Sequence, residues 1–113
     1  MHELGIMYHI VKQVLRVVED NQLEEVEAIV LQVGELSSVI PRYLKACYPA
    51  AVDGTILEST KLEIEELPAN GICQACGKVY ALTEHGGKCP VCQATEHEVL
   101  SGREFFLKEI RAC

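Results

Sequence analysis

Tryptophan is absent from this chain of 113 residues, and aromatic residues make up only 5% of it. A core must therefore consist mainly of aliphatic side chains, which the hydrophobic fraction of 49% supplies. Basic residues are also scarce, with 10 Lys and Arg against 17 Asp and Glu and a net charge of −7. Binding to nucleic acid or to an anionic membrane surface depends on basic residues, so the composition predicts neither partner.

Long apolar segments are missing as well. No run approaches the ~20 residues that a membrane-spanning helix needs. The opening Met1-His2-Glu3 carries no basic side chain, and Glu19 and Asp20 end the first apolar stretch, so no signal peptide is expected. These features predict a cytoplasmic protein, in which six cysteines serve as metal ligands or free thiols more often than as disulfides.

The first 68 residues show the periodicities of an α+β domain. Apolar residues recur at helical spacing over residues 3–20 and predict an amphipathic helix: Leu4, Met7, Ile10, Val11, Val14, Leu15 and Val18. The β-forming residues of 26–36 predict a central strand, because apolar side chains occur on both of its faces. Residues 61–67 predict a second strand.

A second helix is expected between these two strands. Ser37 or Ser38 can cap it, and Pro41 suits its first turn. The helix should run toward Asp53, with Pro49 kinking or shortening it, because proline removes a backbone donor.

The predicted fold is therefore α+β, with a small three-stranded sheet and two helices in residues 1–68. A strand from residues 103–112 completes the sheet. Residues 69–101 are rich in Gly, Cys and polar groups and too poor in apolar residues to fold by packing alone. We expect them to form a zinc-ribbon module held by four cysteines.

Two CxxC pairs define that module. Cys73 and Cys76 form the first pair, Cys89 and Cys92 form the second, and residues 77–88 separate them. Two such pairs facing each other supply the four thiolates of a closed, structural Zn(II) site. Two disulfides, a redox CxxC or an iron site on the same sulfurs are the alternatives.

The other cysteines and histidines carry weaker signals. Cys47 is expected on the apolar side of the second helix, and Cys113 is expected to be an exposed thiol. His9 lies off the apolar stripe of the first helix. His85 and His97, beside the cysteine pairs, could support the metal site, but the plainer interpretation is that all three are ordinary polar residues.

The N-terminus has a definite chelating chemistry. The Met1 amine, the His2 amide nitrogen and the His2 ring can bind one metal in two chelate rings, and the Glu3 amide or carboxylate can complete the set. Planar nitrogen donors favour Ni(II) or Cu(II) over Zn(II). From spacing alone, an exposed terminal histidine without a metal is the preferred interpretation.

Several motifs in order resemble the HypA/HybF family, the nickel metallochaperones of [NiFe]-hydrogenase maturation. The chain opens with Met1-His2-Glu3-Leu4, and the predicted strand ends in Val33-Gly34-Glu35-Leu36-Ser37. Gly54-Thr55 follows the second helix, and the two CxxC pairs complete the series. The resemblance covers essentially the whole chain, and the combination of motifs is more specific than the cysteine pairs alone.

The resemblance implies Ni(II) bound through His2, with Met1 and Glu3 contributing, and a structural zinc on the four cysteines. It implies a hydrogenase-maturation GTPase and a hydrogenase large-subunit precursor as partners, with urease as a second possible recipient. Members that place a carboxylate near the start of the second helix differ from this chain, which has Val39-Ile40-Pro41 there. A monomer or weak homodimer is expected.

Two other classes of function are alternatives to nickel delivery. A zinc-ribbon module that binds nucleic acid or protein is the main alternative, although the acidic balance disfavours nucleic acid. An enzyme is disfavoured because the sequence has no nucleophile motif, no Gly-rich phosphate loop and no open three-ligand metal site.

Overall fold

A computed structural model describes residues 3–112 of the chain, and it divides into two compact units. The first unit comprises Met1–Gln32, Ser38–Glu65 and Phe106–Cys113, and the second comprises Val33–Ser37 and Glu66–Phe105. The sequence-based assignment of a nickel-binding domain and a zinc-binding domain to these parts stays a prediction.

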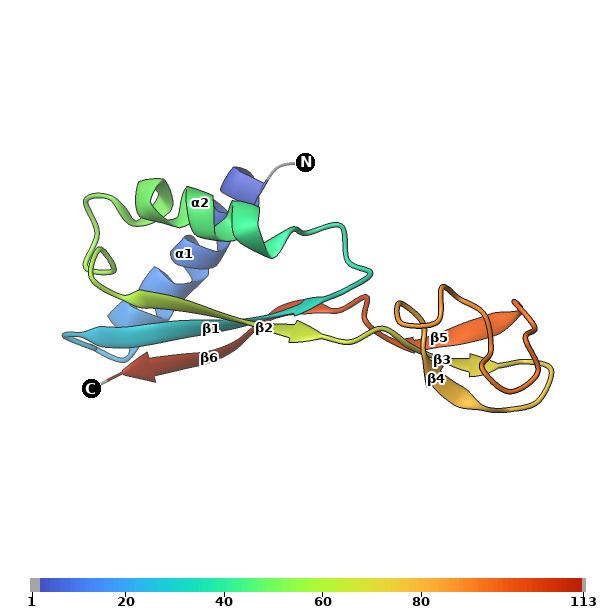
Figure 1. The fold of residues 1–113 in the computed structure, drawn as a ribbon. Helices are drawn as coiled ribbons and strands as arrows, with labels where there is room; N and C mark the ends of the chain where they lie inside the picture. Colours follow the sequence, from blue (N-terminus) through green and yellow to red (C-terminus); the bar gives the residue numbers. More distant parts are fainter. Residues whose placement is uncertain (1–2, 113) are drawn as a thin grey trace. The chain divides into compact units, whose positions relative to one another are not determined.

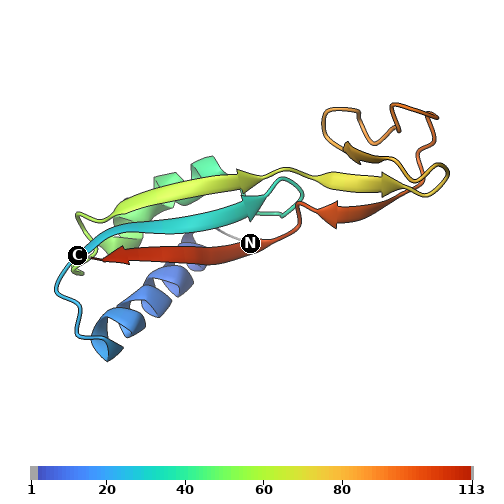
Figure 2. The ribbon, with the colours of Figure 1, turned by 90° about the horizontal axis from the view of Figure 1, so that it is seen from below.

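The first sheet is three-stranded, in the order β2-β1-β6. Its strands are β1 (Val26–Gly34), β2 (Lys61–Leu67) and β6 (Phe105–Ala112). Figure 2 shows β1 and β2 running in the same direction and β6 running against them. The helix α2 (Pro41–Val52) makes the crossover that parallel neighbours require. The predicted three-stranded sheet with two helices is confirmed, and β6 is the third strand of this sheet.

Both helices pack on one face of this sheet (Figures 1 and 2). The helix α1 (Glu3–Asp20) buries the predicted stripe at Met7, Ile10, Val11, Val14 and Val18. Leu4 is an exception, because it is 40% exposed rather than part of the core. The prediction that β1 is central and covered on both sides holds, since the side chains at positions 28–31 are all buried.

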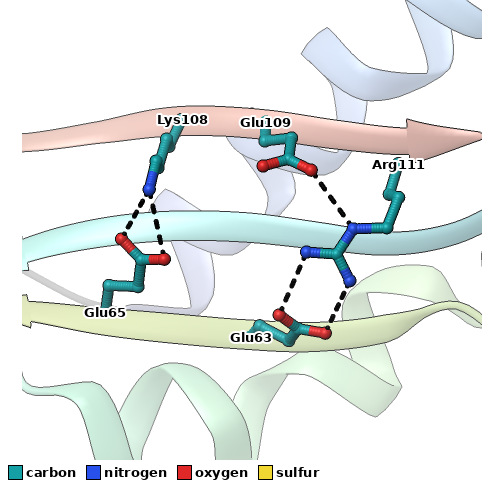
Figure 3. Close-up of polar contacts among 5 residues, drawn as sticks. All are labelled: Glu63, Glu65, Lys108, Glu109 and Arg111. Atoms are coloured by element: carbon teal, nitrogen blue, oxygen red, sulfur yellow. Dashed lines mark hydrogen bonds and ion pairs between the residues drawn. The ribbon is translucent and has the colours of Figure 1, made fainter.

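The opposite face of the sheet is covered by charged side chains. Figure 3 shows Lys108 and Arg111 of β6 reaching over β1 to Glu65 and Glu63 of β2, at 2.9 and 3.1 Å. Gln32 of β1 also donates to Glu65, at 3.0 Å. Hydrogen bonds from Gln32 and then from Lys108 lower the pKa of the Glu65 carboxyl. The pairs therefore bridge the two edge strands above the middle one.

The predicted cap of α2 is wrong. Neither serine caps the helix, because the N-cap is Ile40, without a side-chain cap hydrogen bond. Proline at the first helical position is as expected. Pro49 does not shorten the helix, which continues to Val52. The carbonyl that Pro49 leaves without a helical partner belongs to Lys45, an exposed residue, where water can replace the missing donor.

The second unit contains a smaller sheet in the order β4-β3-β5. Its antiparallel strands are β3 (Asn70–Cys73), β4 (Val79–Ala81) and β5 (His97–Ser101). Neither helix in the described part of the chain has the length and hydropathy that crossing a bilayer requires.

Candidate metal centres

The four cysteines of the CxxC pairs converge in the second unit. Their sulfur atoms all lie within 4.8 Å of one another. The Sγ atoms of Cys73 and Cys92 are 3.5 Å apart, and those of Cys76 and Cys89 are 3.6 Å apart. A tetrahedral site with zinc–sulfur bonds of ~2.3 Å has sulfur–sulfur edges of about 3.8 Å. The sulfurs are thus spaced to surround one ion and are too far apart for disulfides, whose bonds are ~2.05 Å.

The two cysteine pairs lie in equivalent turns. In the first, Gly77 N–H donates to the Cys73 carbonyl and Cys73 N–H donates to the Lys78 carbonyl, both at 2.8 Å. In the second, Gln93 N–H donates to the Cys89 carbonyl at 2.9 Å and Cys89 N–H to the Ala94 carbonyl at 3.0 Å. Each turn brings its two sulfurs to one side of the backbone, as a four-sulfur site needs.

Backbone donors and neighbouring sulfurs lower the pKa of two of the four thiols and raise the pKa of the other two. The Cys76 backbone N–H lowers the pKa of Cys73. Burial raises the pKa of Cys89, but the N–H groups of Cys92 and Val91 outweigh it and the net shift is downward. The N–H groups of Lys78 and Ala94 lower the pKa values of Cys76 and Cys92, but neighbouring sulfurs and burial outweigh them and the net shift at both cysteines is upward. Four thiolates cannot coexist at this distance without a cation, and a bound divalent ion supplies that charge.

Packing alone gives this unit a very small core. Its buried cluster is Ala69, Cys73, Tyr80, Leu82 and Cys89, so two of five members are themselves candidate ligands. Such a core cannot offset the conformational entropy of the loops around it, which is the situation in which metal binding orders a module.

The two histidines near the pairs surround Tyr80 and stay outside the group of four sulfurs, which holds no histidine in the described residues. The rings of His85 and His97 pack edge-on against Tyr80, at 6.0 and 6.3 Å between centroids. His97 Nδ1 also lies 2.9 Å from the Thr95 carbonyl oxygen. Both side chains therefore pack around the only aromatic residue of this core.

Residues 33–37 hold the two strands that enter and leave the cysteine module. Glu35 N–H donates to the Leu67 carbonyl at 2.9 Å, and Leu36 N–H donates to the Gly102 carbonyl at 2.6 Å. The Glu35 carboxylate accepts the Ala69 N–H at 2.7 Å. A Cβ on Gly34 would lie 2.1 Å from the Gly102 carbonyl oxygen. Gly34 and Glu35 thus have structural roles that their motif suggested but that sequence reasoning did not assign.

The predicted nickel ligands lie where the described structure begins. Met1, His2 and Cys113 are outside the described residues. Glu3 is the first residue of α1, and its carboxylate Oε2 accepts the Ile40 N–H at 3.2 Å. Cys47 is half-buried on α2 and is not a member of the four-sulfur group, and His9 is exposed on α1.

A family model described as "Hydrogenase/urease nickel incorporation, metallochaperone, hypA" matches residues 1–112. The chain belongs to the HypA family. It is 34% identical over 110 residues to hydrogenase maturation factor HypA of Trichodesmium erythraeum, covering 97% of this chain and 94% of that one. The counterpart in Dechloromonas aromatica is 36% identical over 114 residues, with 97% of each chain covered.

Two solved HypA structures share this fold. The solution structure of the Ni metallochaperone HypA from Helicobacter pylori has a TM-score of 0.66 at 18% identity, covering 99% of this chain and 97% of its own. A second, described as the solution structure of HypA protein, has a TM-score of 0.70 at 20% identity, covering 100% and 97%. Membership makes this chain a nickel metallochaperone of hydrogenase maturation with a four-cysteine metal site.

Proposed function

We propose that this HypA protein binds Ni(II) at its N-terminus and delivers it to a [NiFe]-hydrogenase large-subunit precursor, together with a maturation GTPase. The family model, matched over residues 1–112, carries the proposal. The sequence at the start of the chain supports it, because Met1 and His2 directly precede the helix that begins at Glu3.

In this account nickel is the cargo and the site is suited to exchange. The terminal amine, the His2 amide nitrogen and the His2 ring give a nitrogen-rich set with little anionic charge. Because protons compete for the amine and the imidazole, acidification weakens the site and promotes release. The chain has no Gly-rich phosphate loop, so the energy of nucleotide hydrolysis comes from the partner GTPase.

The second metal is proposed to be a structural Zn(II) on Cys73, Cys76, Cys89 and Cys92. The spacing of the sulfurs near that of a tetrahedral site supports it, and four thiolates leave no open position for substrate. Bound zinc would order the loops of the second unit and neutralise the thiolates there. Iron bound to the same four sulfurs is the alternative, and metal analysis distinguishes iron from zinc.

Metal analysis combined with nickel titration of the untagged protein tests both assignments. We expect about one tightly held zinc per chain and one further Ni(II). A short peptide added before Met1 should abolish nickel binding and leave zinc unchanged, since it converts the terminal amine into an amide. Normal nickel binding by the tagged protein would remove the amine from the ligand set.

A further inference from the structure

The helix α2 begins without a hydrogen-bond acceptor of its own. Its N-cap residue is Ile40, with φ −103° and ψ 115°, and an isoleucine side chain cannot accept the free backbone donors of a helix start. The first turn holds no acidic residue and includes Arg42, whose charge is unfavourable at the positive end of a helix. An acceptor with negative charge would stabilise this end.

Glu3 supplies that acceptor from another helix. Its Oε2 accepts the Ile40 N–H at 3.2 Å, and the two residues are 37 positions apart in the chain. The helices α1 and α2 begin at the same end of their layer (Figure 1), so the Glu3 carboxylate, whose hydrogen bond to Ile40 is exposed, lies between two positive helix ends. Both the hydrogen bond and the helix dipoles favour keeping the carboxylate at this position.

The backbone nitrogen of Glu3 is available to a metal, whereas the Glu3 carboxylate already accepts a hydrogen bond from Ile40. The first four N–H groups of an α-helix have no partner within the helix, and Glu3 is the first residue of α1. A metal at the N-terminus can therefore take this nitrogen without breaking a helical hydrogen bond. Taking the carboxylate from α2 would instead leave the Ile40 N–H without its acceptor, and the Ile40 side chain has no ligand atom to offer.

We propose that the Glu3 side chain is a positioning residue that fastens the nickel-binding N-terminus to the start of α2, and that it does not bind the metal. This inference rests on the proposed N-terminal nickel site and deepens it. The bond holds Glu3 next to Ile40, so the Glu3 backbone nitrogen loses less conformational freedom when it binds an ion. Nickel then binds nitrogen donors only, and the Glu3 carboxylate affects the site by fixing the position of the Glu3 backbone.

Four variants of the full untagged chain separate a positioning role from a ligand role. Glu3→Ala removes the acceptor, and Glu3→Gln keeps an acceptor while removing the charge. Ile40→Pro removes the donor, since proline has no N–H, and Ile40→Ala keeps that donor as the matched control. Zinc content and helical circular dichroism confirm that each variant is folded.

The readouts are nickel affinity by titration and the absorption spectrum of the bound Ni(II). We expect Glu3→Ala and Ile40→Pro each to weaken nickel binding by about fivefold to tenfold, the effect of one ordinary solvent-exposed hydrogen bond. The double variant should be no weaker than either single one, because both remove the same bond. Glu3→Gln should bind more tightly than Glu3→Ala, Ile40→Ala should match the unaltered protein, and every spectrum should stay the same.

A changed nickel spectrum in both Glu3→Gln and Glu3→Ala, with Ile40→Pro binding normally, would show that the carboxylate is a ligand and overturn the proposal. Unchanged affinity in Glu3→Ala would overturn it too. A readout without nickel is available, since Glu3→Ala should accelerate hydrogen exchange at the Ile40 amide. The His2→Ala variant distinguishes the two claims, because normal nickel binding there refutes the N-terminal site itself, whatever Glu3 does.

Discussion

Gly77 and Gln93 occupy the same position in the two cysteine turns, and both have positive φ angles, 81° and 65°. Glycine adopts this conformation freely, whereas a residue with a side chain pays about 1 kcal/mol or more for it. The second turn therefore keeps the shape of the first at a conformational cost.

Replacing Gln93 by Gly should relieve that cost. We expect about 0.5 kcal/mol of added stability in the metal-bound unit, because the extra freedom of glycine in the unfolded chain cancels part of the gain. Gly77→Ala should have the opposite sign, with a loss of about 1 kcal/mol. Zinc retention against a chelator measures both, and equal losses in the two variants would contradict the equivalence of the turns.

Removing one zinc ligand should unfold the second unit selectively. Cys73→Ala deletes both a sulfur and a member of the buried cluster, so we expect loss of zinc and rapid hydrogen exchange over residues 69–101. The helices α1 and α2 should keep their circular dichroism signal. Cys47→Ala is the matched control, because this half-buried cysteine lies outside the four-sulfur group. Full zinc content in a Cys73→Ala, Cys89→Ala double variant would refute the site.

Zinc affinity should rise with pH. The raised pKa values of Cys76 and Cys92 keep these two thiols protonated near neutral pH in the metal-free protein, so binding must release their protons. Releasing two or more protons makes the apparent affinity increase by about 100-fold or more per pH unit. Competition with a chelator between pH 6.5 and 7.5 measures this slope. A slope near zero would show that all four thiols are already ionised.

The Glu65 carboxylate should make the sheet less stable in acid. Hydrogen bonds from Gln32 and Lys108 lower the pKa of this carboxyl in the folded protein. The carboxylate therefore stabilises the fold fully above the pKa of a glutamate in the unfolded chain, about 4.3. The contribution disappears as the pH falls through the lower folded value. Melting temperatures of the unaltered protein and Glu65→Gln should therefore differ at pH 6, and the difference should shrink as the pH falls below about 4.3. Glu25→Gln, in the turn before β1, is the exposed control, and parallel curves for Glu65→Gln would contradict the account.

Local patterns in the sequence predicted most of the fold, and contacts between distant residues account for what they missed. Periodicity located α1 at 3–20 and β2 at 61–67, because α1 buries one regular face and β2 has half-buried residues at alternating positions. The start of α2 was misplaced because its acceptor, Glu3, belongs to another helix. The exclusion of a Cβ at Gly34 by the Gly102 carbonyl likewise has no local signature.

In the candidate sites, too, local features could be predicted from the sequence and contacts between distant residues could not. The CxxC spacing was enough to group Cys73, Cys76, Cys89 and Cys92, because each pair is a local turn. The left-handed conformation of Gln93 could have been predicted by aligning the two pairs, since it follows its second cysteine as Gly77 does. The hydrogen bond from Ile40 to Glu3 could not, because nothing near either residue in the sequence indicates the other.

Nickel titration of the His2→Ala variant, with His9→Ala as the matched control, tests the central claim most directly. His9 is an exposed histidine on α1, so its removal costs one imidazole without touching the proposed donors. We predict that His2→Ala loses specific nickel binding and keeps its zinc and its helical signal, while His9→Ala binds one Ni(II) as the unaltered protein does. Nickel binding by His2→Ala with unchanged affinity and spectrum would contradict the N-terminal site and direct attention to His85 and His97.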